Sequence, residues 1–498
     1  MFDIRSVKAS GTIYIRADGS IDPPVAPIST VDNITYAFTG NVYDSIAIER
    51  DNIIVDGAGY TVQGAGSGKG VDLSGKGNVT IKNTVVREFD FGIYLNRSES
   101  NTITGNFLTE INFEGIRLYE SSNNNITENR ITVNDCDGVT LYGSLHNRIA
   151  ENNLTSNYDG IRLYESSNNV IVRNTVTNNY YGIFLAFSSN NSIVKNSITA
   201  NYGNGISLVW ISNQNKIAEN LILTNNCGVY LNESSNDDIV ENNITNNYYG
   251  VWFSFSSNDT ISGNGITHNN YGVRSEWSSG NKFYHNNFIN NDCQVYRSGV
   301  LFSPDFWDGG YPSGGNYWSD YNGTDFYGSC FQNETGKDGI GDSAYEVTFS
   351  STIPKISLYD NYPLMGMFHS FNTSLGYNVN VVSNSTIEDF QYFESNTTIR
   401  IYVSNMTVNQ TFGFCRLTIP HDLMTPPYNV VVNGNPVDCN TVFENETLSI
   451  IYFSYEHSTL EIIIVPEFPS NIILPMFLML ATIPSILAKK IRYKKAKT

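Results

Sequence analysis

Charged residues are scarce in this chain of 498 residues, and positive charge is scarcer than negative. Only 15% of the residues are charged, and 29 Lys and Arg stand against 48 Asp and Glu, which gives a net charge of −19. Such a chain repels a polyanionic backbone, so nucleic acid is not the expected partner, whereas cations and neutral glycans remain candidates. Because 40% of the residues are hydrophobic, the polar share falls mainly on Asn, Ser, Thr and Gly, which is typical of extracellular β-proteins.

Cysteine is also sparse, with six residues in the whole chain. Cys415 and Cys439 lie in the same late segment and are the candidates for a disulfide in an oxidising compartment. The first residues contain no apolar stretch that could form the core of a secretory signal, so we expect the natural start to lie upstream. Sequons of the form Asn-x-Ser/Thr, from Asn33 to Asn445, agree with a glycoprotein outside the cell.

The C-terminal end is apolar and then basic. Residues 471–488 contain hardly any polar side chain, and the Lys-rich tail KKIRYKKAKT follows them. A helix of this length rises about 27 Å, enough to cross a hydrocarbon core, and clustered Lys and Arg mark the cytoplasmic side. We therefore expect an extracellular body anchored by one transmembrane helix. The alternative is a buried apolar helix, because Pro475 and Pro484 interrupt the span.

One phrase, a glycine followed by alternating apolar residues, recurs every 22 or 23 residues. Two-helix repeats are longer than this interval, and no 3.6-residue period appears inside the unit. Apolar residues at a period of two, such as Ile161 and Leu163, predict a strand with one buried face. The glycines are Gly92, Gly115, Gly138, Gly160, Gly182, Gly205, Gly228 and Gly250, with weaker copies at Gly70 and Gly272.

A second column of apolar residues runs from Ile103 to Ile261, and an asparagine follows three residues later in each copy, from Asn106 onwards. An asparagine repeated once per coil can hydrogen-bond the copies above and below it, so we expect this column to be structural. The sequence thus predicts an all-β parallel β-helix of about eleven coils of 22–23 residues, stacked about 4.8 Å apart. A leucine-rich horseshoe is the main alternative, but its LxxLxLxxN phrase is absent.

The unit GIxL-x3-SSNN-xI-xxN, over residues 48–368, resembles the right-handed parallel β-helix of NosD-like surface proteins, many of them archaeal, which are related in fold to pectin lyases. The segment VPEFPS at 465–470 is similar to a PEF-type sorting signal, which implies that an archaeosortase-like enzyme removes the apolar span. The resemblance implies a fold and no particular chemistry, because lyases, hydrolases, adhesins and structural proteins share it. The family takes its name from copper-enzyme maturation, but the six His and seven Met form no cluster of soft ligands in the sequence.

The order of segments predicts five parts. Residues 1–46 are expected to form a leader and N-terminal cap, 47–297 the β-helix, and 298–369, rich in Gly, Asp and aromatics, a block that caps the last coil. Short alternating runs in 370–465 predict a small antiparallel β-sandwich that serves as a stalk. Residues 466–498 would hold the PEF-like motif, the transmembrane helix and the basic cytoplasmic tail.

Acidic residues precede the repeat glycine in three successive coils, at Glu114, Asp137 and Asp159. Carboxylates stacked about 5 Å apart raise one another's pKa or require a cation, which prepares acid–base chemistry. They are the candidate catalytic residues of a polysaccharide lyase or glycoside hydrolase. The alternative is a solvated acidic edge neutralised by Arg117 and Arg162.

Outward positions of the predicted strands carry many aromatic residues, which can face sugar rings. The alternative is that neighbouring rings only pack on each other, as in cross-strand ladders. Phe187, Trp210, Phe255 and Trp277 lie near the following turn. The candidate carbohydrate-binding residues are Arg117, Tyr119, Tyr142, Arg162, Tyr164, Phe184, Tyr230 and Trp252.

Oxygen-bearing side chains cluster on glycine-rich turns late in the chain, and calcium is the cofactor that such ligands suit. The alternative is that these residues only form turns. The candidates are Asp320, Asn322 and Asp325 in DYNGTD, and Asp338 and Asp342 in DGIGD. Together these patterns favour a cell-surface protein that binds an extracellular glycan or a surface-layer protein without catalysis; a lyase or hydrolase and a structural spacer or adhesin are the alternatives.

Overall fold

The computed structural model describes residues 11–132, 136–299, 304–347 and 357–467. Nearly every element in these ranges is a strand, and the one helix among them is the short 3-10 turn η1 (Glu394–Asn396). The chain divides into two compact units, one formed by residues 1–323 and 343–364 and the other by residues 324–342 and 365–498.

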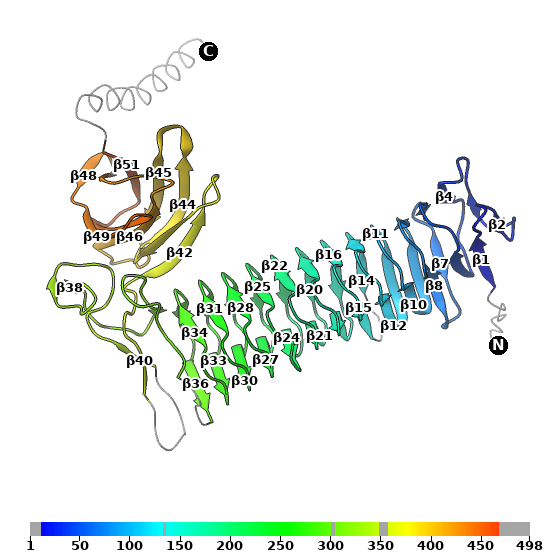
Figure 1. Cartoon of the computed structure of the whole chain (residues 1–498), viewed down its shortest axis with the longest axis horizontal. Helices are drawn as coiled ribbons and strands as arrows, with labels where there is room; N and C mark the ends of the chain where they lie inside the picture. Colours follow the sequence, from blue (N-terminus) through cyan, green and yellow to red (C-terminus); the bar gives the residue numbers. More distant parts are fainter. Residues whose placement is uncertain (1–10, 133–135, 300–303, 348–356, 468–498) are drawn as a thin grey trace, which may run out of the picture. The chain divides into compact units, whose positions relative to one another are not determined.

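The first unit is a parallel β-solenoid of about 12 turns, visible in Figure 1 as stacked coils coloured from blue to green. Equivalent residues lie directly above one another: Ile161 pairs with Ile183 and Leu163 with Leu185 in the neighbouring coil. The predicted solenoid, with its glycine phrases aligned along one axis, is therefore confirmed.

Each coil has three faces. The first face consists of the longer strands, and those from β8 to β33 contain the glycine phrase. The strands are β1 (Thr12–Ile15), β5 (Ser45–Ile48), β8 (Lys69–Asp72), β10 (Val85–Asn96), β12 (Phe107–Tyr119), β15 (Asp137–Tyr142), β18 (Asp159–Tyr164), β21 (Tyr181–Ala186), β24 (Asn204–Val209), β27 (Cys227–Asn232), β30 (Tyr249–Ser254), β33 (Tyr271–Glu276) and β36 (Cys293–Ser298). We call this first face the long-strand face.

The second face is a 13-stranded sheet. Its strands are β3 (Ile28–Ser29), β4 (Thr35–Phe38), β6 (Ile54–Asp56), β9 (Thr80–Lys82), β11 (Thr102–Thr104), β13 (Asn125–Thr127), β16 (Arg148–Ala150), β19 (Val170–Val172), β22 (Ser192–Val194), β25 (Lys216–Ala218), β28 (Asp238–Val240), β31 (Thr260–Ser262) and β34 (Lys282–Tyr284).

Short strands form the third face, and β10 and β12 run through both the first and the third, so that these two faces join into one 24-stranded sheet. The short strands are β7 (Thr61–Gln63), β14 (Arg130–Thr132), β17 (Asn153–Thr155), β20 (Thr175–Thr177), β23 (Ser197–Thr199), β26 (Leu221–Leu223), β29 (Asn243–Thr245), β32 (Gly265–Thr267), β35 (Asn287–Ile289) and β37 (Tyr317–Trp318).

The core is a column of apolar side chains inside the coils. One coil contributes Ile161, Leu163, Ile171 and Val176, and each of these side chains is fully buried. A single coil cannot bury this face alone, so stacking provides the hydrophobic driving force. The repeat glycine permits close stacking at one corner, since a Cβ on Gly182 would lie 2.4 Å from the carbonyl oxygen of Gly205.

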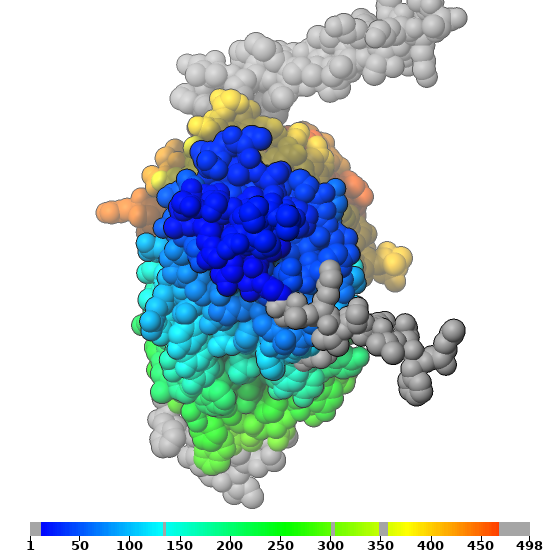
Figure 2. Space-filling model, turned by 90° about the vertical axis from the view of Figure 1, so that its right-hand side faces the viewer, coloured from blue at the N-terminus to red at the C-terminus, as the bar shows by residue number. Residues whose placement is uncertain are grey.

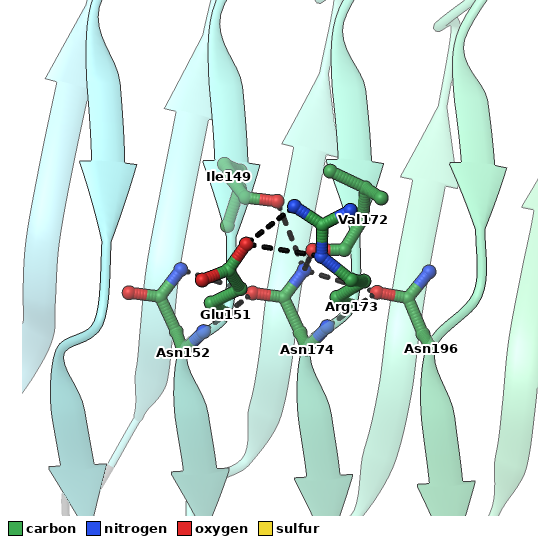
Figure 3. Close-up of polar contacts among 7 residues, drawn as sticks. All are labelled: Ile149, Glu151, Asn152, Val172, Arg173, Asn174 and Asn196. Carbon is green, nitrogen blue, oxygen red and sulfur yellow. Dashed lines mark hydrogen bonds and ion pairs between the residues drawn. The ribbon is translucent and has the colours of Figure 1, made fainter.

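Buried asparagines form ladders at the corners between the faces. In Figure 3, Asn174 Nδ2 donates to the carbonyl oxygen of Ile149 (2.9 Å) and to Asn196 Oδ1 (3.0 Å). Its own Oδ1 accepts the backbone N–H of Asn152 (3.0 Å) and that residue's Nδ2 (2.9 Å). The sequence predicted this one ladder, and the structure has two more, which begin at Asn101 and Asn157.

The solenoid extends beyond the predicted limits 47–297 at both ends. Residues Thr12–Ile15 pair in parallel with Ser45–Ile48, so the expected cap already contains a coil. β2 (Ile21–Asp22) and β3 make antiparallel contacts near the end seen in Figure 2, where dark-blue residues lie over the coils behind them. At the other end β37 pairs in parallel with β35, and Trp318 stacks on Phe288 with 4.3 Å between ring centroids. An aromatic side chain of β37 therefore packs on the last coil, and antiparallel strands accompany the first coils.

The second unit contains two five-stranded antiparallel sheets that share one apolar core. One sheet has the order β42 (Met367–Asn372), β43 (Asn378–Ser383), β46 (Phe412–Pro420), β50 (Leu448–Glu456) and β49 (Asn440–Glu444). The other has the order β44 (Thr386–Phe393), β45 (Thr398–Ser404), β51 (Leu460–Pro466), β47 (Tyr428–Val432) and β48 (Asn435–Val437). The second unit also contains a small hairpin of β38 (Tyr327–Gly328) with β39 (Glu334–Thr335), while the antiparallel pair of β40 (Tyr345–Val347) and β41 (Leu358–Asp360) belongs to the first unit.

The predicted disulfide between Cys415 and Cys439 is wrong, since both thiols are free. Cys415 pairs with Phe453 on one side of β50, while Asn440, the neighbour of Cys439, pairs with Tyr452 on the other side. Two strand spacings separate the cysteines, about 9.6 Å, and a disulfide needs Cα atoms closer than about 7 Å.

Among the described residues, no helix is both long and apolar enough to cross a bilayer. The predicted transmembrane helix and basic tail fall on residues 468–498, and the start of the predicted leader falls on residues 1–10; both segments lie outside the described residues.

Candidate functional site

The three acids singled out in the sequence lie in one row on the long-strand face. Glu114 pairs in register with Asp137, and the backbone N–H of Asp159 donates to Asp137 Oδ1 (3.2 Å). The stacking that the sequence predicted for these carboxyl groups is therefore present.

This row is buried rather than solvated. The side chains of Glu114, Asp137 and Asp159 are 13%, 4% and 1% exposed. Arg117 Nη1 lies 3.1 Å from Glu114 Oε1, and Arg162 Nη1 lies 3.8 Å from Asp137 Oδ2 and 3.5 Å from Asp159 Oδ2. The alternative to catalysis, a solvated acidic edge neutralised by Arg117 and Arg162, is wrong about the solvation, whereas the two arginines do lie beside the carboxyl groups.

Burial raises the pKa of all three acids. It raises the pKa of Asp159 to about 8, with a further contribution from the charge of Asp137, while Arg162 opposes the shift. Asp159 Oδ1 is buried with no hydrogen-bond partner among the described residues. Burial also raises the pKa of the neighbouring Cys136 thiol to about 11, so this cysteine is not an activated nucleophile. The row therefore favours a bound proton and holds Arg117 and Arg162 in place. Its two aspartates are nearly fully buried, so a substrate does not reach them.

The next outward column mixes aromatic rings with arginines. Arg162 lies over the ring of Phe184 (5.4 Å from Cζ to the centroid), and Arg274 lies over Trp252 (4.4 Å). Tyr230 packs against Trp252 with 5.0 Å between centroids. These side chains are half-buried, so the column is a packed layer with polar edges.

Three more predicted residues, Tyr119, Tyr142 and Tyr164, form a stack of nearly parallel rings with centroid distances of 5.2 and 5.1 Å. The rings of this column therefore pack on each other like a cross-strand ladder, which was the alternative to sugar binding. They are half-buried, so their edges also remain accessible.

Four rings stand out at the turn directly after the long strands. Phe187, Trp210, Phe255 and Trp277 have positive φ angles of 51°, 53°, 52° and 53° and are 42%, 44%, 57% and 48% exposed. We call them the corner aromatics. Phe187 is nearly parallel to Trp210 (30° between planes) and Phe255 to Trp277 (4°), with centroids 5.7 and 6.3 Å apart.

The corner aromatics occupy a conformation that bulky residues avoid. A left-handed residue other than glycine costs about 1–2 kcal/mol, and other coils place Glu120, Glu165 and Glu233 at this corner. Since about half of each ring is exposed, core packing does not offset this cost. The sequence placed these four residues near the turn that follows the strand, and they do share one corner of the coils.

A second set of exposed rings, which the sequence analysis missed, precedes the long strands. Tyr158, Tyr180, Tyr202 and Tyr248 are 46%, 46%, 78% and 47% exposed, and Tyr158 stacks on Tyr180 with 5.0 Å between centroids. We call them the edge tyrosines. The long-strand face thus has exposed rings at both ends of its strands.

Three of the five predicted calcium ligands, Asp325, Asp338 and Asp342, act as turn acceptors, whereas Asp320 accepts from Gln294 Nε2 and the hydroxyl of Tyr345. Asp325 accepts the backbone N–H groups of Asp338 and Gly339 at 3.1 Å, and Asp342 accepts those of Phe326 and Tyr327. Asp320 and Asn322 belong to the first unit and the other three residues to the second. Within the described ranges, no three Asp, Glu, His or Cys side chains are placed to hold one metal ion.

The sequence also matches a known family over the solenoid. The family model described as "Periplasmic copper-binding protein (NosD)" matches residues 48–207 and 201–323, more than half of the chain. The chain belongs to the NosD family. No curated protein matches it significantly.

Several solved structures resemble this NosD-family chain. The A-module of Azotobacter vinelandii mannuronan C-5 epimerase AlgE6 is 16% identical, with a TM-score of 0.49 over 60% of this chain and 90% of that one. The Dettilon tailspike protein gp208 is 15% identical, with a TM-score of 0.38 over 84% and 87% of the two chains. The periplasmic alginate epimerase AlgG is 17% identical, with a TM-score of 0.36 over 56% and 79%.

The copper of the family's description does not fit the side chains seen here. Copper sites combine imidazole, thiolate or thioether ligands, and no such group of three His, Cys or acidic residues occurs in the described part of the chain. Two histidines already have polar neighbours: His421 Nε2 lies 2.8 Å from Ser449 Oγ, and His457 Nε2 lies 2.7 Å from Ser385 Oγ. Burial raises the pKa of Cys415 to about 11, which disfavours its thiolate.

Proposed function

We propose that this NosD-family solenoid binds a glycan chain on the long-strand face, between the corner aromatics and the edge tyrosines. The observation that carries the proposal is that four bulky rings are kept exposed in the left-handed conformation. Such rings offer flat apolar surfaces to sugar rings, and the half-exposed Arg162 and Arg274 supply hydrogen-bond donors nearby.

The same geometry favours binding over catalysis. A general acid must come within hydrogen-bond reach of its substrate, and Asp137 and Asp159 are covered by Arg162. The word "periplasmic" in the family's description supports a place outside the cytoplasm. We further propose that residues 471–488 anchor the protein at the cell surface, where the partner is an extracellular glycan or a glycan-bearing surface-layer protein.

The double variant Trp210→Ala/Trp277→Ala tests the binding face. We expect the full chain to bind at least one member of a panel of neutral and acidic polysaccharides, measured by calorimetry and by retardation in polysaccharide-containing gels. The double variant should bind about 30- to 1,000-fold more weakly, because each of the two aromatic anchors contributes about 1–2 kcal/mol. Glu165→Ala, which alters the same corner of another coil without removing a ring, should bind as the natural protein does.

Two results would overturn the proposal. If no polysaccharide binds, or if the double variant binds unchanged while its unfolding temperature is also unchanged, the solenoid is a spacer or uses another face. If an acidic polysaccharide is cleaved or epimerised and Asp137→Ala abolishes the turnover, the acid row is an active site and the protein is an enzyme.

A further inference from the structure

One ladder of the solenoid contains aspartates where the other coils have asparagine. In most of the asparagine coils, Oδ1 accepts a backbone N–H from the neighbouring coil and Nδ2 donates to a backbone carbonyl; the Nδ2 of Asn281 is buried with no partner among the described residues. Asn169, for example, accepts the N–H of Asn147 (2.8 Å), and its Nδ2 donates to the carbonyl oxygens of Ser144 (3.0 Å) and Ser167 (3.1 Å). The ladder consists of Asn101, Asn124, Asn147, Asn169, Asn191, Asn215, Asp237, Asp259, Asn281 and Asp305.

Asp237 and Asp259 reproduce only half of this pattern. Asp237 Oδ1 accepts the N–H of Asn215 (2.7 Å), and Asp259 Oδ1 accepts the N–H of Asp237 (2.9 Å). The second oxygen, Oδ2, of each carboxyl group is buried with no partner among the described residues, and both side chains are fully buried. In most of the asparagine coils the corresponding atom is a donor that points at carbonyl oxygens. An ionised oxygen would meet lone pairs there, whereas an O–H group would donate to them.

The charges around the two acids do not compensate an ionised carboxylate. Asp238, which follows Asp237, is exposed and negative. Asp305, two coils beyond Asp259, has its own partner in Arg297, whose Nη2 donates to the carbonyl oxygen of Ser278 (2.6 Å). No ion pair reaches Asp237 or Asp259 among the described residues.

We infer that Asp237 and Asp259 are held as neutral carboxylic acids and make this part of the solenoid a pH-sensitive segment, most stable in acid and weakened as the pH rises. Desolvation raises the pKa of Asp237 to about 8 and that of Asp259 well above its ordinary value. Burial raises the pKa of Asp305 to about 6, and Arg297 beside it opposes the shift.

The sign of the effect follows from proton binding. An unfolded aspartate has a pKa of about 3.9, so between about pH 3.9 and 8 the folded chain binds more protons than the unfolded chain and stability falls with pH. Once both carboxyl groups are ionised, at still higher pH, they lie about 4.8 Å apart and repel each other. Asp259 comes four residues after the corner aromatic Phe255, so the weakened segment supports part of the proposed binding face.

The test compares Asp237→Asn/Asp259→Asn with the natural chain in thermal unfolding from pH 4 to pH 9. An amide can donate at any pH, so the double variant should unfold at nearly the natural temperature at pH 4. At pH 8 it should unfold several degrees higher, and its curve against pH should be flatter. Asp238→Asn, an exposed aspartate beside Asp237, is the matched control and should leave the curve unchanged.

Infrared spectroscopy gives a second readout that needs no stability change. The natural chain at pH 6 should show the C=O stretch of buried protonated carboxylic acids, and the double variant should lack the part due to these two residues. The inference is overturned if the two proteins have the same dependence of unfolding on pH, or if the band is the same in both. If the double variant fails to fold, the single variant Asp237→Asn takes its place: a weaker band at pH 6 than in the natural chain supports the inference, and an equal band refutes it.

Discussion

Asn174→Leu is expected to lower the free energy of unfolding of the solenoid by about 3–5 kcal/mol, since each buried polar group left unpaired costs about 1–3 kcal/mol. Leucine matches asparagine in shape but leaves the carbonyl oxygens of Ile149 and Val172 without the donor Nδ2. It also removes the acceptor of the N–H and Nδ2 of Asn152 (Figure 3). Chemical denaturation followed by circular dichroism measures the loss.

Two further variants show whether the ladder itself carries this effect. Asn153 is an exposed residue of β17 that follows the ladder residue Asn152, and Asn153→Ala should alter the free energy of unfolding by less than about 0.5 kcal/mol. Asn174→Asp keeps the acceptor and, when protonated, regains a donor, so it should cost little at pH 4 and much more at pH 8. If Asn174→Leu is no worse than Asn153→Ala, the ladder does not hold the coils together.

The solenoid could be predicted because its unit repeats. A one-residue slip would turn Ile161 and Leu163 to the solvent in every coil, so an alternating phrase that recurs every 22–23 residues fixes both strand and register. The ladder through Asn174 was predicted from the same alignment. The ladders that begin at Asn101 and Asn157 were not, because the neighbouring turn positions also carry many Asn and Ser residues, and burial alone distinguishes them.

The ends and the chemistry were harder to predict. Between the first coil at Thr12–Ile15 and β5 the chain forms the antiparallel strands β2 and β3, so the 22- to 23-residue repeat is not visible there in the sequence. The sequence placed Asp137 and Asp159 in one row, but it did not predict that both side chains are buried beside Arg162. The exposure of the corner aromatics depends on a left-handed backbone, and the alternation of apolar residues does not predict that conformation. Such features follow from the path of the chain at the turns rather than from periodicity.

Gly182→Ala is expected to be nearly as damaging as a cavity in the core, although it adds a single methyl group. That Cβ would lie 2.4 Å from the carbonyl oxygen of Gly205, 2.9 Å from Ile198 Cγ2 and 3.1 Å from Asn201 Nδ2. The nearest of these atoms belongs to the backbone of the next coil and cannot rotate away, so the coils must separate locally. Overpacking of this kind costs about 1–3 kcal/mol or more, and we expect about 3 kcal/mol from denaturation curves.

Gly265→Ala is the matched control, because Gly265 also belongs to the solenoid and its Cβ would meet no atom closer than 4.0 Å. Its φ is outside the left-handed region, so alanine should be neutral or stabilise by about 0.4–1 kcal/mol through the unfolded chain. The difference between the two variants isolates the close approach of the coils from the loss of a flexible residue. Equal stabilities would mean that the repeated glycines, from Gly92 to Gly250, are not required by coil stacking and that their periodicity has another cause.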